Sequence, residues 1–199
     1  MIKAVAVILA GGKSRRMGRD KLELDFGGVS MLESAVNRFK AEFYDDVYIS
    51  VADIEKYSEV KARRVIDIYP GMGPLSGLHA ALKMTPAMVD GIFLVAADLP
   101  YASAQAAKNL IKLCGDSEIC VIRLFDGKLE PLFAYYSKSL LQRCENQIKS
   151  GDYRMSVLIS NADVRYVAPY ELGTYWDEKI IWNINNPDDY AKISRLTEK

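Results

Sequence analysis

Two adjacent glycines and several basic residues follow the first apolar segment of the chain, in the stretch VILAGGKSRRMGRDK (7–21). Gly11 and Gly12 lack side chains, so their backbone N–H groups can approach a bound anion closely and adopt positive φ. Arg16 and Lys21 would add positive charge, and a guanidinium group matches phosphate oxygens in shape. The stretch could therefore bind phosphate, although a tight turn with solvated basic residues would have the same composition.

Two aspartates follow other apolar segments. Asp98 ends GIFLVAAD (91–98), and Asp67 lies near the end of RRVIDIY (63–69). A carboxylate at the end of a buried strand could hold Mg²⁺, which takes oxygen ligands and bridges to substrate phosphates. Alternatively, the Asp98 side chain could cap the turn before Pro100, which is a common use of aspartate. The same ambiguity applies to Asp67.

Glycines and asparagines mark two further candidate segments. The stretch GMGPLSG contains Gly73 and Gly77, where the backbone could pass close to a ligand or form a flexible turn. Asn183 and Asn185 alternate within IIWNIN (180–185), which predicts a strand with both amides on one face. These amides could bind a ligand or satisfy local backbone groups.

Apolar segments alternate along the chain with segments of helical spacing. The segments 4–10 and 91–98 are apolar runs, typical of strands buried on both faces. Further strands are expected over residues 46–52, 63–69, 118–124, 129–136 and 180–185. Helices are expected after the capping box of Ser30 and Glu33, after Asn186, and near 78–84, 103–114 and 138–149. The alternation predicts one α/β domain over 1–199 with a largely parallel sheet, whose ligands would bind beyond the carboxyl ends of the strands.

The composition limits the partners of the chain. Lys plus Arg and Asp plus Glu number 26 each, so no net charge would hold the protein on nucleic acid or an anionic membrane. We expect neither a signal peptide nor a membrane span, and Cys114, Cys120 and Cys144 fit no zinc or redox motif, which favours a cytoplasmic protein with buried thiols. His79, the only histidine, is expected to be a packed or surface residue and not a base.

Several motifs together resemble one family. The stretch LAGGKSRRMGRDK (9–21) is similar to the signature L-A-G-G-x-S-x-R-M-G-x-D-K of molybdenum cofactor guanylyltransferases, the MobA-type nucleotidyltransferases. Further matches follow in the same order, namely Asp67 before GPLSG (73–77), then AADLP (96–100), EPLF (130–133), GDYR (151–154) and NINNPDD (183–189). The resemblance therefore covers nearly the whole chain.

The resemblance implies a fold, a reaction and partners. The implied fold is an α/β, Rossmann-like three-layer sandwich with a mainly parallel, mixed central sheet. The implied reaction transfers GMP from Mg-GTP to molybdopterin that carries molybdenum and releases pyrophosphate. Molybdoenzymes or cofactor-delivery proteins would be further partners, and nucleic acid and membrane would not be.

The resemblance also implies roles for individual residues. Nucleotide binding falls to Leu9, Ala10, Gly11, Gly12, Lys21, Asp67 and Asp98. Catalysis falls to Arg16 and Lys21, which would bind phosphates, and to Asp98, which would bind the Mg²⁺. Loop shape falls to Gly18, Gly73 and Gly77. Acceptor binding, on the pterin side, falls to Arg154, Asn183 and Asn185.

Two positions depart from the family pattern. Only Arg19 stands between the Met-Gly and Asp-Lys pairs, where many members have an additional residue, and Ser50 stands where relatives tend to carry a nucleotide-binding asparagine. The alternative is therefore a related nucleotidyltransferase that uses CTP or another NTP with molybdopterin, an isoprenoid or a sugar phosphate. A non-catalytic nucleotide-binding regulator would be a different class of protein. Lys21 and Asp98 together favour catalysis, since binding alone could dispense with a metal.

Overall fold

A seven-stranded sheet forms the centre of the protein, with the strand order β3-β2-β1-β4-β6-β5-β7. The computed structural model describes residues 2–11 and 20–197, with side chains described up to Ile193. The strands are β1 (Ala4–Leu9), β2 (Val47–Val51), β3 (Arg63–Ile66), β4 (Gly91–Ala96), β5 (Ile119–Arg123), β6 (Leu129–Ser137) and β7 (Val164–Val167).

All the strands of this sheet run parallel to one another except β6. The pairs β1–β2, β1–β4, β2–β3 and β5–β7 are parallel, whereas β6 pairs antiparallel with both β4 and β5. The expectation of a mainly parallel, mixed sheet is therefore confirmed. Because β1 to β4 are mutually parallel, their carboxyl ends meet along one edge of the sheet.

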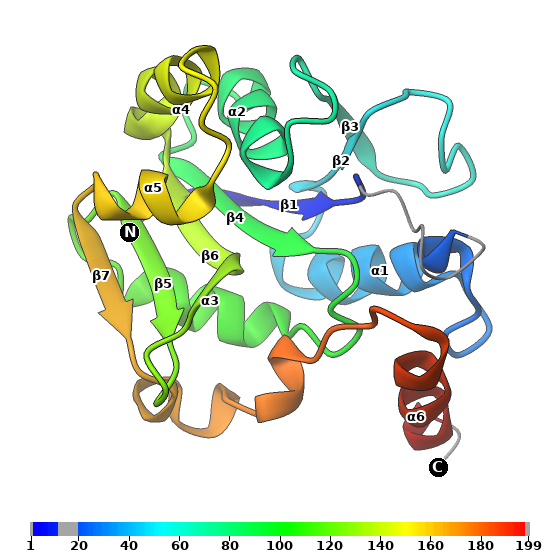
Figure 1. The fold of residues 1–199 in the computed structure, drawn as a ribbon. Coiled ribbons are helices and arrows are strands. Elements are labelled where there is room, and N and C mark those ends of the chain that lie inside the picture. Colours follow the sequence, from blue (N-terminus) through cyan, green and yellow to red (C-terminus); the bar gives the residue numbers. More distant parts are fainter. Residues whose placement is uncertain (1, 12–19, 198–199) are drawn as a thin grey trace.

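Helices cover both faces of the sheet, which gives three layers (Figure 1). Helices α1 (Met31–Phe43) and α3 (Ala104–Lys112) pack on one face, and α2 (Pro74–Met84), α4 (Leu141–Lys149) and α5 (Met155–Ser160) pack on the other. Helix α6 (Pro187–Thr197) follows near the C-terminus. None of the helices in the described ranges is both long and apolar enough to cross a membrane.

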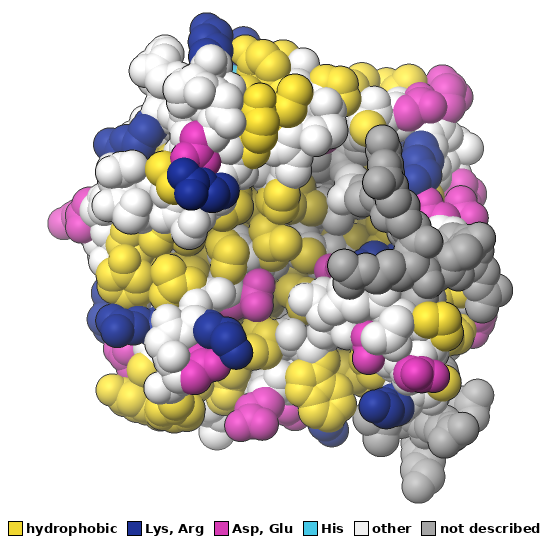
Figure 2. Space-filling view, in the orientation of Figure 1, with side chains coloured by type: hydrophobic (Ala, Val, Ile, Leu, Met, Phe, Trp, Pro, Cys, Tyr) yellow, Lys and Arg dark blue, Asp and Glu magenta, His cyan; other side chains and the backbone are white. Residues whose placement is uncertain are grey.

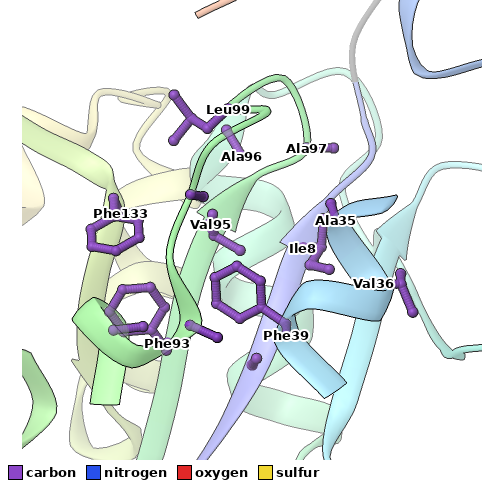
Figure 3. Packing of buried hydrophobic residues seen from close by; sticks show 14 of the residues in the cluster. Ile8, Ala35, Val36, Phe39, Phe93, Val95, Ala96, Ala97, Leu99 and Phe133 are labelled. Carbon is purple, nitrogen blue, oxygen red and sulfur yellow. The ribbon is translucent and has the colours of Figure 1, made fainter. Parts of the chain in front are cut away.

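Successive residues of the central strands supply the two halves of the core. In β1, Ala6 and Ile8 join the cluster under α1 and α3, whereas Val5 and Val7 join the cluster under α2 and α4. Figure 3 shows Phe39 of α1 beside Phe93 of β4, whose ring centroids lie 6.2 Å apart. Burial on both faces explains why these strands read as continuous apolar runs.

Side chains at two helix starts confirm the expected boundaries. The Ser30 hydroxyl accepts a hydrogen bond from the Glu33 backbone N–H, 3.2 Å away, at the start of α1. At the start of α6, the Asn186 side chain accepts from the Asp189 N–H at 2.9 Å, and the Asp189 carboxylate accepts from the Asn186 N–H at 3.2 Å. Such reciprocal bonds satisfy N–H groups that the first helical turn leaves without partners.

The strand expected over 180–185 is wrong. The 3-10 helix η4 (Glu178–Ile181) begins in this region, and an extended segment without strand pairing follows it. Its Ile184 N–H donates to the backbone oxygen of Asp98 over 3.1 Å, so the segment crosses the end of β4 and does not extend the sheet. The short elements α5 and β7 were not anticipated from the sequence, because neither is long enough to show a clear period.

His79 is completely buried between α2 and α4, which confirms it as a packing residue. Neither ring nitrogen has a hydrogen-bond partner in the described part of the chain, and the Glu145 carboxylate lies 3.9 Å from Nε2. Burial lowers the pKa of His79, and the nearby ammonium groups of Lys83 and Lys149 lower it further, against the opposing charge of Glu145. The folded protein therefore favours the neutral imidazole.

The stability of the protein should consequently fall as the pH drops below about 6.5, the ordinary pKa of an unfolded histidine. In that range the unfolded chain binds a proton that the folded chain resists. We expect urea denaturation to give a smaller free energy of unfolding at about pH 5.5 than at about pH 7.5. His79→Leu removes the titrating group, so its free energy of unfolding should fall less between these two pH values than that of the unsubstituted chain. An equal fall in both proteins would contradict the neutral assignment.

Candidate active site

Asp98 lies just beyond β4 and is bound by two other parts of the chain. The Lys21 ammonium, from the 3-10 helix η1 (Lys21–Glu23), donates to Asp98 Oδ2 over 2.5 Å and to the Ile184 carbonyl oxygen over 3.0 Å. With its amide nitrogen facing the carboxylate, Asn183 donates to Asp98 Oδ1 at 2.9 Å and to Oδ2 at 3.2 Å. The fold therefore brings together Lys21, Asp98 and Asn183 from three distant stretches of sequence.

A second group of predicted residues meets at the ends of β1, β2 and β3. The Ser50 hydroxyl donates to Asp67 Oδ1 over 2.9 Å, and burial raises the pKa of the Asp67 carboxyl group. A Cβ atom built on Gly11 would lie 3.9 Å from Asp67 Oδ2. The Ala10 N–H donates to the Ser50 carbonyl oxygen at 2.9 Å, which fixes the chain leaving β1 next to β2.

Gly77 belongs to this second group for a reason other than the one expected. It lies inside α2 and not in a loop, and a Cβ atom there would come within 2.5 Å of Leu9 Cδ2 and 2.8 Å of Ser50 Oγ. Glycine thus lets α2 pack closely against the ends of β1 and β2. Gly73 is the residue before α2, and its φ of 73° is a conformation that favours glycine.

Glu130 belongs to the stretch EPLF (130–133), whose sequence indicates no individual role for it. It lies on β6, which pairs with β4 in a register that sets Phe133 opposite Val95 and, if continued, leads Glu130 toward Asp98. Burial raises the pKa of Glu130, and the negative charge of Asp98 raises it further. Glu130 is directed toward Asp98 by the antiparallel pairing of β6 with β4, and a short sequence motif does not reveal that pairing.

The remaining predicted residues either have partners other than Asp98 or are not among the residues that the structure describes. Arg154 precedes α5 and pairs with Asp152, with 2.5 Å between Nη2 and Oδ2. The side chain of Asn185 is exposed, and its backbone N–H donates to Asp189. Asn185 and Asn183 do not share a strand face, since the segment is not a strand. Gly12, Arg16 and Gly18 lie outside the described residues.

The Asp98 carboxylate is a ligand that suits a hard divalent cation, provided that a substrate supplies further ligands. Carboxylate oxygens are ligands that Mg²⁺ and Mn²⁺ accept, and Mg²⁺ usually takes one or two carboxylates together with phosphates and water. Within residues 2–11 and 20–197 there is no cluster of three or more His, Cys, Asp or Glu side chains that could hold a metal alone. Asp98, with a side chain 22% exposed, could therefore supply one ligand to a metal that arrives with phosphate groups.

This arrangement is suited to moving a phosphate-linked group by charge and position. Lys21 provides a cation and Asp98 a carboxylate, side by side at the strand ends. The three cysteines are buried, and His79 is enclosed between α2 and α4, so among the described residues neither type offers an accessible nucleophile. Positioning and electrostatic stabilisation carry most of the catalysis in phosphoryl-type transfers, which need no nucleophilic side chain.

Comparisons with known proteins agree with this geometry. The family model described as "MobA-like NTP transferase domain" matches residues 6–165. A protein of Pelotomaculum thermopropionicum named "Probable molybdenum cofactor guanylyltransferase" is 33% identical over 100% of this chain and 95% of its own length.

Solved structures share the fold. Molybdopterin-guanine dinucleotide biosynthesis protein A from Archaeoglobus fulgidus has a TM-score of 0.82 at 23% identity, over 97% of this chain and 98% of that one. Rv0371C from Mycobacterium tuberculosis, solved as a complex with manganese, has a TM-score of 0.67 at 17% identity, over 97% of this chain and 98% of that one. At these identities the likeness supports the three-layer fold.

Proposed function

We propose that this chain, which belongs to the family of MobA-like NTP transferase domains, transfers GMP from Mg-GTP to molybdopterin that carries molybdenum. The products would be molybdopterin guanine dinucleotide and pyrophosphate. The observation that carries the proposal is the contact between Lys21 and Asp98 at the end of β4, where a phosphate-binding cation and a metal ligand meet. The names of the relatives supply the guanine base and the acceptor.

In the proposed complex the nucleotide lies over the ends of β1, β2 and β3. The backbone of Leu9, Ala10 and Gly11 would border the nucleotide, and Asp67, held by Ser50, would accept hydrogen bonds from it. Lys21 would bind the triphosphate, whose negative charge grows on the departing pyrophosphate. Gly12, Arg16 and Gly18 are proposed to complete the phosphate loop. Mg²⁺ at Asp98 would neutralise phosphate charge when bound.

The acceptor is proposed to approach from the β6 side of Asp98. In the strand order β6 follows β4, on the side away from β1 and the proposed nucleotide. Figure 2 shows a hollow lined mainly by hydrophobic side chains in the middle of the molecule, which overlies β4 and β6 in Figure 1. Arg154, Asn183 and Asn185 are proposed to bind the acceptor, and Asn183 would also orient Asp98 through its amide. Molybdoenzymes or cofactor-delivery proteins would receive the product.

Asn183 and Asn185 should be separable by mutation. Asn185→Ala is expected to weaken acceptor binding and to leave the affinity for Mg-GTP nearly unchanged, because among the described residues its exposed side chain does not donate to Asp98 as that of Asn183 does. Asn183→Ala should weaken acceptor binding and also metal-dependent GTP binding, because it removes the amide that orients Asp98. Calorimetric titrations with GTP, with and without Mg²⁺, measure the difference. A loss of GTP affinity in Asn185→Ala would reverse the assignment of the two sides.

The reaction itself is tested by incubating the protein with each NTP, Mg²⁺ and molybdopterin and identifying the product by mass. A product that contains GMP, formed with release of pyrophosphate, is the expected result. Ser50 favours including CTP as the second candidate, since it replaces a residue associated with the base. A CMP product would change the proposed nucleotide. Binding of GTP without release of pyrophosphate in the presence of any acceptor would indicate a regulator.

A further inference from the structure

We propose that the Lys21 ammonium takes the place of the metal at Asp98 while the nucleotide is absent, so that a divalent cation binds there only together with the nucleotide. The inference rests on the proposed function in one respect, namely that Asp98 is the metal ligand. It adds an order to binding. The metal would enter as the metal–nucleotide complex, and the protein without nucleotide would exclude free metal.

Both carboxylate oxygens of Asp98 are engaged by protein donors. Oδ2 accepts from the Lys21 ammonium at 2.5 Å and Oδ1 accepts from the Asn183 amide at 2.9 Å. These oxygens are the atoms that a divalent cation would use. Each carboxylate oxygen can accept a second partner, but a metal bound directly to Asp98 would lie beside the Lys21 ammonium unless that ammonium moved.

Lys21 is held firmly at this position. Its ammonium also donates to the Ile184 carbonyl oxygen at 3.0 Å, and only 17% of its side chain is exposed. The Ile184 backbone N–H in turn donates to the Asp98 carbonyl oxygen at 3.1 Å. The segment around Ile184 is therefore bonded to both Lys21 and Asp98. The ammonium therefore has a defined place beside Asp98.

The charges around Asp98 favour one cation at a time. Mg²⁺ lies about 2.0–2.1 Å from its oxygen ligands, and an ammonium bound to the same oxygen would lie within a few ångströms of it. Two cations at that separation repel strongly in a partly buried site. Lys21 and the metal should thus compete for Asp98.

A bound triphosphate would remove this competition. Its oxygens can accept the Lys21 ammonium and can ligate the metal at the same time, so Lys21 would turn from Asp98 to the phosphates and leave Oδ2 to the metal. The nucleotide would then strengthen metal binding, and by reciprocity the metal would strengthen nucleotide binding by the same factor.

Mn²⁺ binding to the protein without nucleotide tests the exchange. We expect Lys21→Met, which keeps a long apolar side chain without the charge, to bind Mn²⁺ at least about tenfold more tightly than the unsubstituted chain. Free Mn²⁺ is measured by electron paramagnetic resonance. Lys149→Met is the matched control, because Lys149 also pairs with a carboxylate, that of Glu145 at 2.7 Å, but on α4. This control should bind Mn²⁺ like the unsubstituted chain.

The comparison is repeated with GTP and with the double substitution Lys21→Met and Asp98→Asn. GTP should strengthen Mn²⁺ binding more in the unsubstituted chain than in Lys21→Met, and the double substitution should remove the gain in Mn²⁺ affinity. Equal Mn²⁺ affinity of the unsubstituted chain and Lys21→Met without GTP would overturn the exchange and leave the metal site in place. Tight Mn²⁺ binding to the double variant would place the metal elsewhere. Failure of every protein to bind Mn²⁺, even with GTP, would remove Asp98 as a metal ligand and the proposed mechanism with it.

Discussion

Asp98→Asn should lower turnover by more than about 10²-fold and leave the protein folded, since one well-placed electrostatic contact has effects of this size. Asparagine has the shape of aspartate and lacks its charge, so the metal loses its anionic ligand. The backbone bond from the Ile184 N–H to the Asp98 carbonyl oxygen does not depend on the side chain and should remain. Pyrophosphate release measures turnover, and circular dichroism and thermal unfolding measure the fold.

Unchanged turnover in Asp98→Asn would indicate that the Asp98 side chain only caps a turn. If its side chain only capped a turn, asparagine would serve equally well, and turnover would stay at the level of the unsubstituted chain. In the described structure its carboxylate accepts from Lys21 and Asn183, and no backbone N–H of the following turn donates to it, which favours the metal role. Asp126→Asn is a suitable control, because Asp126 also pairs with a lysine, Lys128, but is exposed on the β5–β6 connection.

Lys21→Ala is expected to reduce kcat by about 10²-fold with little change in the thermal unfolding temperature, because the ammonium stabilises phosphate charge in the transition state. The effect on stability should be small, since the described bonds of the ammonium are to polar atoms, the Asp98 carboxylate and the Ile184 carbonyl oxygen. Steady-state kinetics with each substrate varied in turn would separate kcat from KM. Normal turnover in the folded variant would move the phosphate site away from Lys21.

Together with the proposed exchange, this result would separate metal binding from catalysis. A protein without the Lys21 ammonium should hold Mn²⁺ more tightly in the absence of nucleotide and yet turn over more slowly. A residue that only maintained the structure of the site would be expected to weaken both properties together when removed. Opposite changes would therefore identify Lys21 as a group that changes partners during binding.

Segments whose pattern reflects local burial could be predicted well from the sequence. The apolar runs of β1 and β4 are buried on both faces, and the cap at Ser30 depends on residues three positions apart. In these cases, near neighbours in the sequence determine the structure. That Asp98 and Asp67 lie along the same edge of the sheet follows from a general property of parallel sheets, namely that their carboxyl ends share one edge.

The remaining features depend on contacts between distant parts of the chain. The apolar residues in 180–185 suggested a strand, but Ile180 and Ile184 are buried as the chain passes from a 3-10 helix across the strand ends. Gly77 is needed because of Leu9 and Ser50, which belong to other elements. Glu130 gains its place from the reversal of β6 relative to β4. Sequence patterns over a few neighbouring residues do not predict these contacts.

The bond between Ile184 and Asp98 bears on how the protein is made on the ribosome. Every strand of the described sheet has been synthesised once β7 ends at Val167, but Ile184, which holds both Asp98 and Lys21, emerges later. A growing chain can therefore complete its sheet before Asp98 acquires its final neighbours. Nascent chains that stop before Asn183 would have a formed core without the finished site. Newly made molecules could thus begin to bind a nucleotide at Asp98 only after the segment around Ile184 has left the ribosome.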